Sequence, residues 1–168
     1  MRIIILQHNY IRKIFALLIV AILFVLVDIN YITADDSTKF FCPIDSGRVV
    51  STFGYHLHPI FRKYRQHNGI DIETAKGSPV YATSDGKIIL AYNNGGYGKT
   101  VIISHPDGYE SRYGHLNEIK VIDGQEVSKG DIIGTVGNTG LTTSFKLYFE
   151  IRKNEEPIDP LIMIDINF

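Results

Sequence analysis

His67 and Asp71 are the residues whose types and spacing most directly suggest chemistry in this chain. An imidazole and a carboxylate at this separation can share a divalent metal ion, and both are ordinary zinc ligands. On a helix the spacing would put both side chains on one face. Gly69 and the alternating Ile70 and Ile72 instead favour a short strand, or a turn that leads into one. The pair alone is weak evidence, because histidine and aspartate also meet by chance in surface loops.

The elements that would position this pair are short strands. From residue 46 onward, β-branched and aromatic runs alternate with turns, and Asp85-Gly86 and Asp107-Gly108 are hairpin signals. We therefore predict an all-β fold, an antiparallel β-sandwich or partly open barrel. The predicted strands cover residues 49–53, 80–82, 87–92, 100–105, 109–113, 131–136 and 146–152.

Composition limits the function classes. The chain has 168 residues, 45% of them hydrophobic and 21% charged, which is typical of one folded domain. The net charge is −1 and there is no long basic run, so nothing indicates a nucleic-acid partner. Cys42 is the only cysteine, which excludes an intramolecular disulfide, and we interpret it as unmodified.

The N-terminus has the pattern of an export segment. Arg2, Arg12 and Lys13 precede an apolar run over residues 14–27, which is short for a membrane span but typical of a signal peptide. We predict that residues 1–34 form a hydrophobic export helix, either a signal peptide or an uncleaved signal anchor in the inner membrane. The alternative is a buried core helix. Export would place the working domain in the periplasm or on the extracytoplasmic face of the cytoplasmic membrane.

The remaining boundaries follow from composition. We assign residues 35–45 to a linker, residues 46–153 to the β domain, and residues 154–168 to a C-terminal tail. Leu161, Ile162 and Ile164 are expected to pack the tail against the domain.

Ordered motifs give the chain a family resemblance. It resembles the LytM or lysostaphin-like zinc metallopeptidases, which cut peptidoglycan cross-links and have the duplicated hybrid motif fold. The resemblance runs from about Ser51 to Pro160. Its pieces are Thr52-Phe53-Gly54, His58-Pro59, His67-Asn68-Gly69-Ile70-Asp71, Gly77-Ser78-Pro79-Val80-Tyr81-Ala82, Asp85-Gly86, Gly96-Tyr97-Gly98, Ile103-Ser104-His105, Tyr113-Gly114-His115-Leu116, residues 124–130 and Gly134-Thr135-Val136-Gly137-Asn138-Thr139-Gly140.

The resemblance implies roles for three residues. His67 and Asp71 match two metal ligands of the family, and His115 matches an imidazole that acts on the bound water and the transition state. Such a zinc has three protein ligands and an open water position, lowers the pKa of the water and polarises the scissile carbonyl. Imidazoles then move protons.

The chain departs from the family at its last motif. The family has His-Leu-His-Phe-Glu, and this chain has Lys146-Leu147-Tyr148-Phe149-Glu150. Lys146 therefore replaces a catalytic histidine, and Tyr148 replaces the third metal ligand, on the same face of a strand. An unperturbed tyrosine has a pKa of about 10, and a lysine ammonium repels a dication. We expect zinc to bind weakly or not at all.

Other interpretations of these residues stay open. His56 and His58 lie where the family has its cleft rim, and we do not expect them to replace the lost ligands. We interpret His105 as structural, and His115 could fill a hydrogen-bonded slot. His67 and Asp71 could bond each other, with Lys146 as the counter-charge of Asp71. Several tyrosines could line a groove for glycan or peptide: Tyr55, Tyr64, Tyr81, Tyr97 and Tyr113.

Two functions compete. In the first, the domain is a catalytically inactive module that contacts peptidoglycan or a cell-wall hydrolase or division partner and regulates cleavage of the wall. In the second, it is a zinc-dependent metalloendopeptidase with an unusual ligand set. The replacements at Lys146 and Tyr148 favour the first, and the survival of His67, Asp71 and His115 favours the second.

Overall fold

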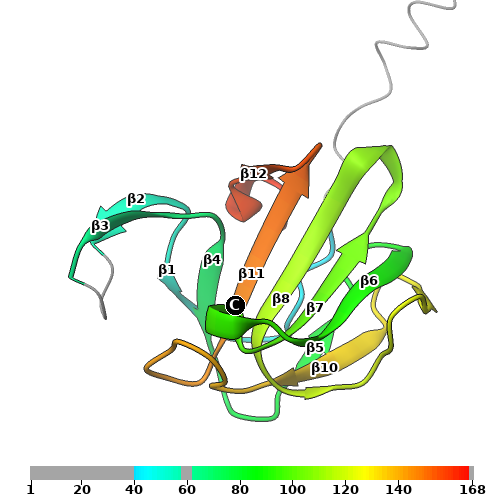
Figure 1. The fold of residues 1–168 in the computed structure, drawn as a ribbon, viewed down its shortest axis with the longest axis horizontal. Coiled ribbons are helices and arrows are strands. Elements are labelled where there is room, and N and C mark those ends of the chain that lie inside the picture. The colour runs from blue at the N-terminus through cyan, green and yellow to red at the C-terminus, as the bar shows by residue number, and fades with distance from the viewer. Residues whose placement is uncertain (1–39, 58–61, 167–168) are drawn as a thin grey trace, which may run out of the picture. The chain divides into compact units, whose positions relative to one another are not determined.

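A computed structural model describes residues 40–57 and 62–166 of the chain, and its regular structure there is β apart from three short 3-10 turns. The main sheet has ten strands, and all its strand pairs are antiparallel (Figure 1). This confirms the predicted all-β antiparallel class, as open sheets rather than a closed barrel. The strands are β1 (Arg48–Ser51), β2 (Gly54–Leu57), β3 (Tyr64–His67), β4 (Ile70–Glu73), β5 (Pro79–Tyr81), β6 (Gly86–Asn93), β7 (Lys99–Ser104), β8 (Tyr109–Ile119), β9 (Glu126–Val127), β10 (Ile132–Val136), β11 (Lys146–Lys153) and β12 (Glu156–Ile158).

Strand β11 lies at the centre of the sheet, between β4 and β8. Its alternate residues Leu147, Phe149 and Ile151 are fully buried in the hydrophobic core. Because side chains alternate along a strand, this burial turns Lys146 and Tyr148 to the opposite face. The core therefore decides which side chains of β11 are available for chemistry.

The register of three neighbouring strands brings the candidate residues together. Tyr148 on β11 is paired with Asp71 on β4, and Asp71 is paired with Ser51 on β1. Lys146 is paired with Glu73 in the same ladder. Residues paired across antiparallel strands have side chains within contact distance, so Asp71 lies between the side chains of β1 and those of β11.

The hairpin β2–β3 forms a separate two-stranded sheet, which extends to one side of the main sheet in Figure 1. His67 ends β3, and Ile70 begins β4, so the predicted turn into a strand at this motif is confirmed. Gly69 lies in the turn, where a Cβ atom would stand 2.3 Å from the carbonyl oxygen of Phe149. A glycine is required because the turn touches the backbone of β11 directly.

The domain begins earlier than the sequence predicts. Phe40 and Ile44 belong to the buried core, and Phe40 forms a parallel bridge with Ile164. Phe40, Pro43 and Ile44, which lie in the segment that we assigned to the linker, are therefore packed into the domain. The predictions for residues 1–34 and 35–39 lie outside the described residues. Within the described part of the chain, no helix is long and apolar enough to cross a membrane.

The C-terminal tail contacts the domain differently from the expectation. Strand β12 pairs with β11, and Ile164 is buried. Leu161 and Ile162 are 38% and 69% exposed, so the expectation that they pack the tail on the domain is wrong. Pro160 is buried in their place, at the start of the 3-10 turn that they share.

His105 belongs to a buried polar network and not to the candidate site. Its Nδ1–H donates to the Asp85 carbonyl at 2.7 Å, and its Nε2 is 2.7 Å from the Ser111 hydroxyl. That hydroxyl is joined to the Tyr113 hydroxyl at 2.9 Å. The structure thus confirms the interpretation of His105 as structural.

A pH titration of stability would test this network. Burial lowers the pKa of His105 more than the Asp85 carbonyl and the charge of Glu110 raise it. The unfolded state, with a histidine pKa of about 6.5, therefore binds the proton first as the pH falls. We expect the contribution of His105 to be complete above that pH and to be lost below it, by at most about 1.4 kcal/mol per pH unit. The free energy of unfolding of His105→Gln should fall less steeply below pH 6.5 than that of the wild type in urea titrations, and parallel curves would contradict the assignment.

The close approach at Gly69 gives a second prediction. Gly69→Ala should lower the free energy of unfolding by about 1–3 kcal/mol, because the new methyl group overlaps the β11 backbone. Gly96→Ala is a matched control, since its Cβ would meet only the flexible side chain of Leu141, at 3.3 Å. Urea midpoints measure both, and equal midpoints for the two variants would show that the turn can move away.

Candidate functional site

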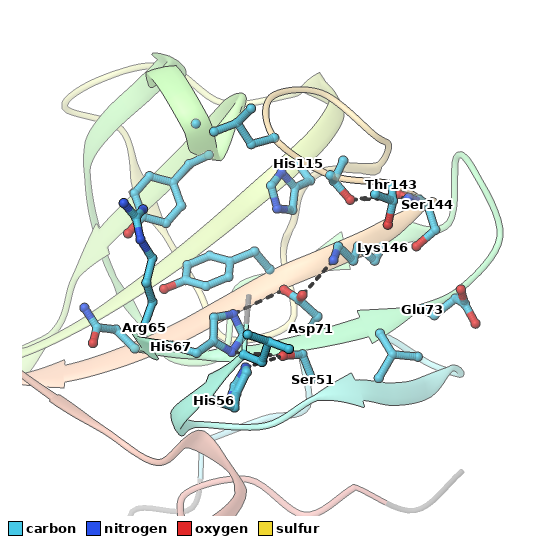
Figure 2. A pocket seen from close by; sticks show the side chains of 18 of the residues that line it. Ser51, His56, Arg65, His67, Asp71, Glu73, His115, Thr143, Ser144 and Lys146 are labelled. Atoms are coloured by element: carbon cyan, nitrogen blue, oxygen red, sulfur yellow. Dashed lines mark hydrogen bonds and ion pairs between the residues drawn. The ribbon is translucent and has the colours of Figure 1, made fainter. Parts of the chain in front are cut away.

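A groove of about 800 Å³ lies over β4 and β11. The hairpin β2–β3 and strand β1 line one side, and Tyr97 and residues 141–144 line the other. His67, Asp71, His115, Lys146 and Tyr148 all line the groove, so the structure brings the five candidate metal-site and catalytic residues of the sequence analysis to one place (Figure 2).

His67 is oriented by a backbone carbonyl. Its Nδ1 is 2.9 Å from the carbonyl oxygen of Thr52, which can only accept, so Nδ1 carries a proton. The other ring nitrogen, Nε2, is 3.5 Å from Oδ1 of Asp71. That distance is a charge contact rather than a good hydrogen bond, and Oδ1 is buried without a hydrogen-bond partner.

Lys146 supplies the strong partner of Asp71. Its Nζ donates to Oδ2 at 2.7 Å, and the two side chains are 11% and 10% exposed. Figure 2 shows Lys146 and His67 approaching the carboxylate from opposite sides. The counter-charge role that we considered for Lys146 is therefore confirmed. Glu73, which pairs with Lys146 in the ladder, is instead held by Arg48 at 2.8 Å.

These contacts shift two pKa values. Burial alone would raise the pKa of the Asp71 carboxyl, but His67 and Lys146 outweigh burial and hold it below its ordinary value. Burial would lower the pKa of His67, but Asp71 and the Thr52 carbonyl outweigh burial and raise it. The cluster thus favours an ionised Asp71 carboxylate, which the Lys146 ammonium accompanies.

The hydroxyl of Tyr148 forms a hydrogen bond with Glu150, two residues further along the same strand. Its hydroxyl donates to Glu150 Oε2 at 2.5 Å, and Arg152 donates to the other oxygen of this fully buried carboxylate. Its ring lies 5.0 Å from that of Tyr97 and 5.4 Å from that of His67, between centroids. Burial and the charge of Glu150 raise the pKa of Tyr148 far above its ordinary value, so the phenol stays neutral.

His115 enters the groove from an irregular point in β8. Its φ is 60°, a left-handed conformation that few non-glycine residues adopt, and the pairing of β8 with β7 and β10 shifts register beside it. Its Nδ1–H donates to the Thr139 carbonyl at 2.8 Å. Burial lowers the pKa of His115, which favours the neutral imidazole.

The donors present do not fit a three-ligand zinc. The ammonium of Lys146 holds the carboxylate of Asp71, and the hydroxyl of Tyr148 donates to Glu150. Among the described residues, no group of three or more histidine, cysteine, aspartate or glutamate side chains could hold a metal ion. Within the part of the chain that the structure describes, no third ligand joins His67 and Asp71, and the Lys146 ammonium lies beside them.

Sequence reasoning missed the groups that hold the two imidazoles. Both are backbone carbonyls, of Thr52 and Thr139, and a carbonyl leaves no mark in residue type. His56 contacts His67 ring to ring at 5.4 Å and shares Ser51 with it, whereas His58 lies outside the described residues. Of the five tyrosines offered as groove residues, all described, Tyr97 alone lines the groove.

Comparison with known proteins identifies relatives. The sequence profile of peptidase family M23 matches residues 65–160. Over 119 residues the chain is 41% identical to DD-carboxypeptidase/endopeptidase Mpg of Neisseria meningitidis. The aligned region covers 71% of this chain and 27% of the relative. Over 116 residues it is 40% identical to murein hydrolase activator NlpD of Escherichia coli. That aligned region covers 68% of this chain and 28% of the relative. The chain thus spans about a quarter of the length of these curated relatives.

Solved structures agree with the fold. A zinc-containing peptidase from Vibrio cholerae superposes with a TM-score of 0.66 at 34% identity, covering 77% of this chain and 41% of that one. The matched relatives therefore include peptidases and an activator of hydrolases, and the residues of the groove must distinguish the two.

The bond between Tyr148 and Glu150 can be tested by removing one oxygen atom. Tyr148→Phe should lower the free energy of unfolding by about 1–3 kcal/mol, because it leaves a buried carboxylate oxygen without its donor. Tyr55→Phe is the control, since Tyr55 is 71% exposed and should change stability by less than about 0.5 kcal/mol. Urea denaturation measures both, and equal losses would show that the Glu150 oxygen finds another donor when the hydroxyl of Tyr148 is removed.

Proposed function

Because the chain belongs to peptidase family M23, we propose that it acts at the bacterial cell wall as a binding module without peptidase activity. The groove holds peptidoglycan, or a cell-wall hydrolase whose activity the module regulates. The observation that carries this proposal is the ion pair between Lys146 and Asp71, at 2.7 Å, because the family resemblance makes Asp71 a metal ligand. The groove stays open above it, so recognition survives the loss of catalysis.

The relatives support both parts of the proposal. The Neisseria relative is a carboxypeptidase and endopeptidase, and NlpD is a murein hydrolase activator, so a chain of this family acts on peptidoglycan or on an enzyme that does. A hydrolytic site of this type needs a third ligand for zinc and a base for the water. The family resemblance assigns Tyr148 and Lys146 to those two positions, and in this structure Tyr148 bonds Glu150 while Lys146 bonds Asp71.

A second candidate is a zinc-dependent endopeptidase with an unusual ligand set. His67, Asp71 and His115 favour it, because all three line one groove and both imidazoles have their Nδ1 fixed by a carbonyl. This orientation suits metal ligands and catalytic bases. The candidate requires Lys146 to leave Asp71, and it therefore ranks second.

The proposed location is outside the cytoplasmic membrane. The basic and apolar pattern of residues 1–34 supports export, either as a freed periplasmic protein or as one tethered to the inner membrane. In both cases the groove faces the compartment that contains the wall.

Co-sedimentation of the purified full chain with peptidoglycan sacculi tests the proposal. We expect the wild type to sediment with sacculi and to release no soluble fragments from dye-labelled sacculi in the presence of zinc. Thr143→Trp, which fills the groove from its rim, should bind at least about tenfold more weakly, a loss of about 1.4 kcal/mol.

The matched control is Ile122→Trp, which adds the same indole at a residue that is 72% exposed and does not line the groove. Equal binding of the two variants to sacculi would show that the groove takes no part in the interaction with the wall. Release of fragments by the wild type, abolished in His67→Ala, would establish the second candidate instead.

A further inference from the structure

We propose that Lys146 is the resident cation of this site, so that its ammonium and a divalent metal ion exclude each other at Asp71. Lys146 then keeps the floor of the groove charge-balanced without a metal. This inference concerns what holds the site together, and it stands independently of what the groove binds.

The neighbouring charges direct Lys146 to Asp71. In the ladder Lys146 lies opposite Glu73, which would be its ordinary cross-strand partner. Arg48, from β1, takes Glu73 in a pair whose side chains are 75% and 41% exposed. Lys146 reaches diagonally across to Asp71 on the neighbouring strand β4, where both side chains are almost fully buried. The Arg48–Glu73 pair is thus exposed to solvent and contributes little to stability. The Lys146–Asp71 pair is buried at the floor of the groove, where loss of either partner would leave an uncompensated charge.

A metal at Asp71 would meet this ammonium at very short range. A zinc ligand oxygen lies about 2.0–2.2 Å from the ion, and Nζ of Lys146 is 2.7 Å from Oδ2. Repulsion between like charges is strong at such distances in a buried site. A zinc ion on either oxygen of Asp71 would therefore lie close to this ammonium, and we expect the repulsion to prevent zinc from binding while Lys146 holds the carboxylate.

Tyr148 adds a second and separate barrier. Turning its hydroxyl toward Asp71 would break the bond to Glu150 and leave a buried carboxylate oxygen without that donor. Arg152 fixes the same carboxylate from its other side. Replacing Lys146 alone therefore removes the repulsion without supplying a third ligand, and replacing Tyr148 alone supplies a ligand beside a cation.

The test is a two-by-two set of variants: the wild type, Lys146→His, Tyr148→His and the double variant. Zinc per chain is measured after zinc loading and dialysis, and melting temperature is measured in EDTA and in zinc. We expect the wild type to retain no zinc and to melt at the same temperature in both. The double variant should retain about one zinc per chain, melt below the wild type in EDTA and melt several degrees higher in zinc.

Lys120→His is the matched control for the added imidazole, since Lys120 is exposed and lies outside the groove. It should behave as the wild type does. A wild type that retains about one zinc per chain and melts lower in EDTA would overturn the inference. So would a double variant that melts like the wild type in EDTA and does not respond to zinc, or one that fails to fold even with zinc.

Lys146→Met gives a readout that needs no metal site. It removes the cation and keeps most of the length of the side chain, so Asp71 becomes a buried charge with one partner fewer, and the melting temperature in EDTA should fall by several degrees. Lys146→Arg keeps the charge and should recover much of the loss. Unchanged melting of Lys146→Met would show that Lys146 does not balance Asp71. Sedimentation with sacculi does not enter these measurements, so the binding proposal and this inference can fail separately.

Discussion

The register between β4 and β11 is the constraint on which the groove depends. Because Tyr148 lies opposite Asp71, the outward residues of β11 decide what the aspartate touches. The inward residues, with Leu147 and Phe149 fully buried, hold that register from below. A slip of the register by one residue would turn Lys146 into the core and expose the apolar side chains of β11, which would strongly destabilise the sheet. The hydrophobic core therefore fixes the chemistry of a site that it does not touch.

The polar side chains on the outward face of β11 are all bonded to one another or to Asp71. At every second position it carries Lys146, Tyr148, Glu150 and Arg152, which are a cation, a phenol, a carboxylate and a cation. Lys146 bonds Asp71 on the neighbouring strand, and the other three bond one another. A buried ion pair is not in itself evidence of stability, because desolvation opposes its attraction. Once Asp71 is buried, however, some cation must accompany it, and the structure shows which one does.

The sequence predicts the strands of the sheet and the pairing of Lys146 with Asp71. It does not predict the packing of the N-terminal segment or the backbone groups that hold the two imidazoles. Alternation of apolar residues places β11 correctly, and the reasoning that Lys146 would counter Asp71 follows from charge on one strand face. The packing of residues 40–45 could not be predicted, because two separate apolar residues, Phe40 and Ile44, leave no period. The left-handed turn at His115 and the carbonyls that hold the imidazoles are backbone features, which residue types do not encode.

These carbonyls also bear on how such a site changes. The Nδ1 atoms of His67 and His115 are held by Thr52 and Thr139, and neither bond involves a metal. The lysine ammonium supplies a positive charge at Asp71, where its bond length is an ordinary one. The groove is therefore held by backbone carbonyls and by an internal ion pair. Because the inward residues of β11 form the core and its outward residues form the contacts of the groove, substitutions at outward positions can change those contacts without changing the core.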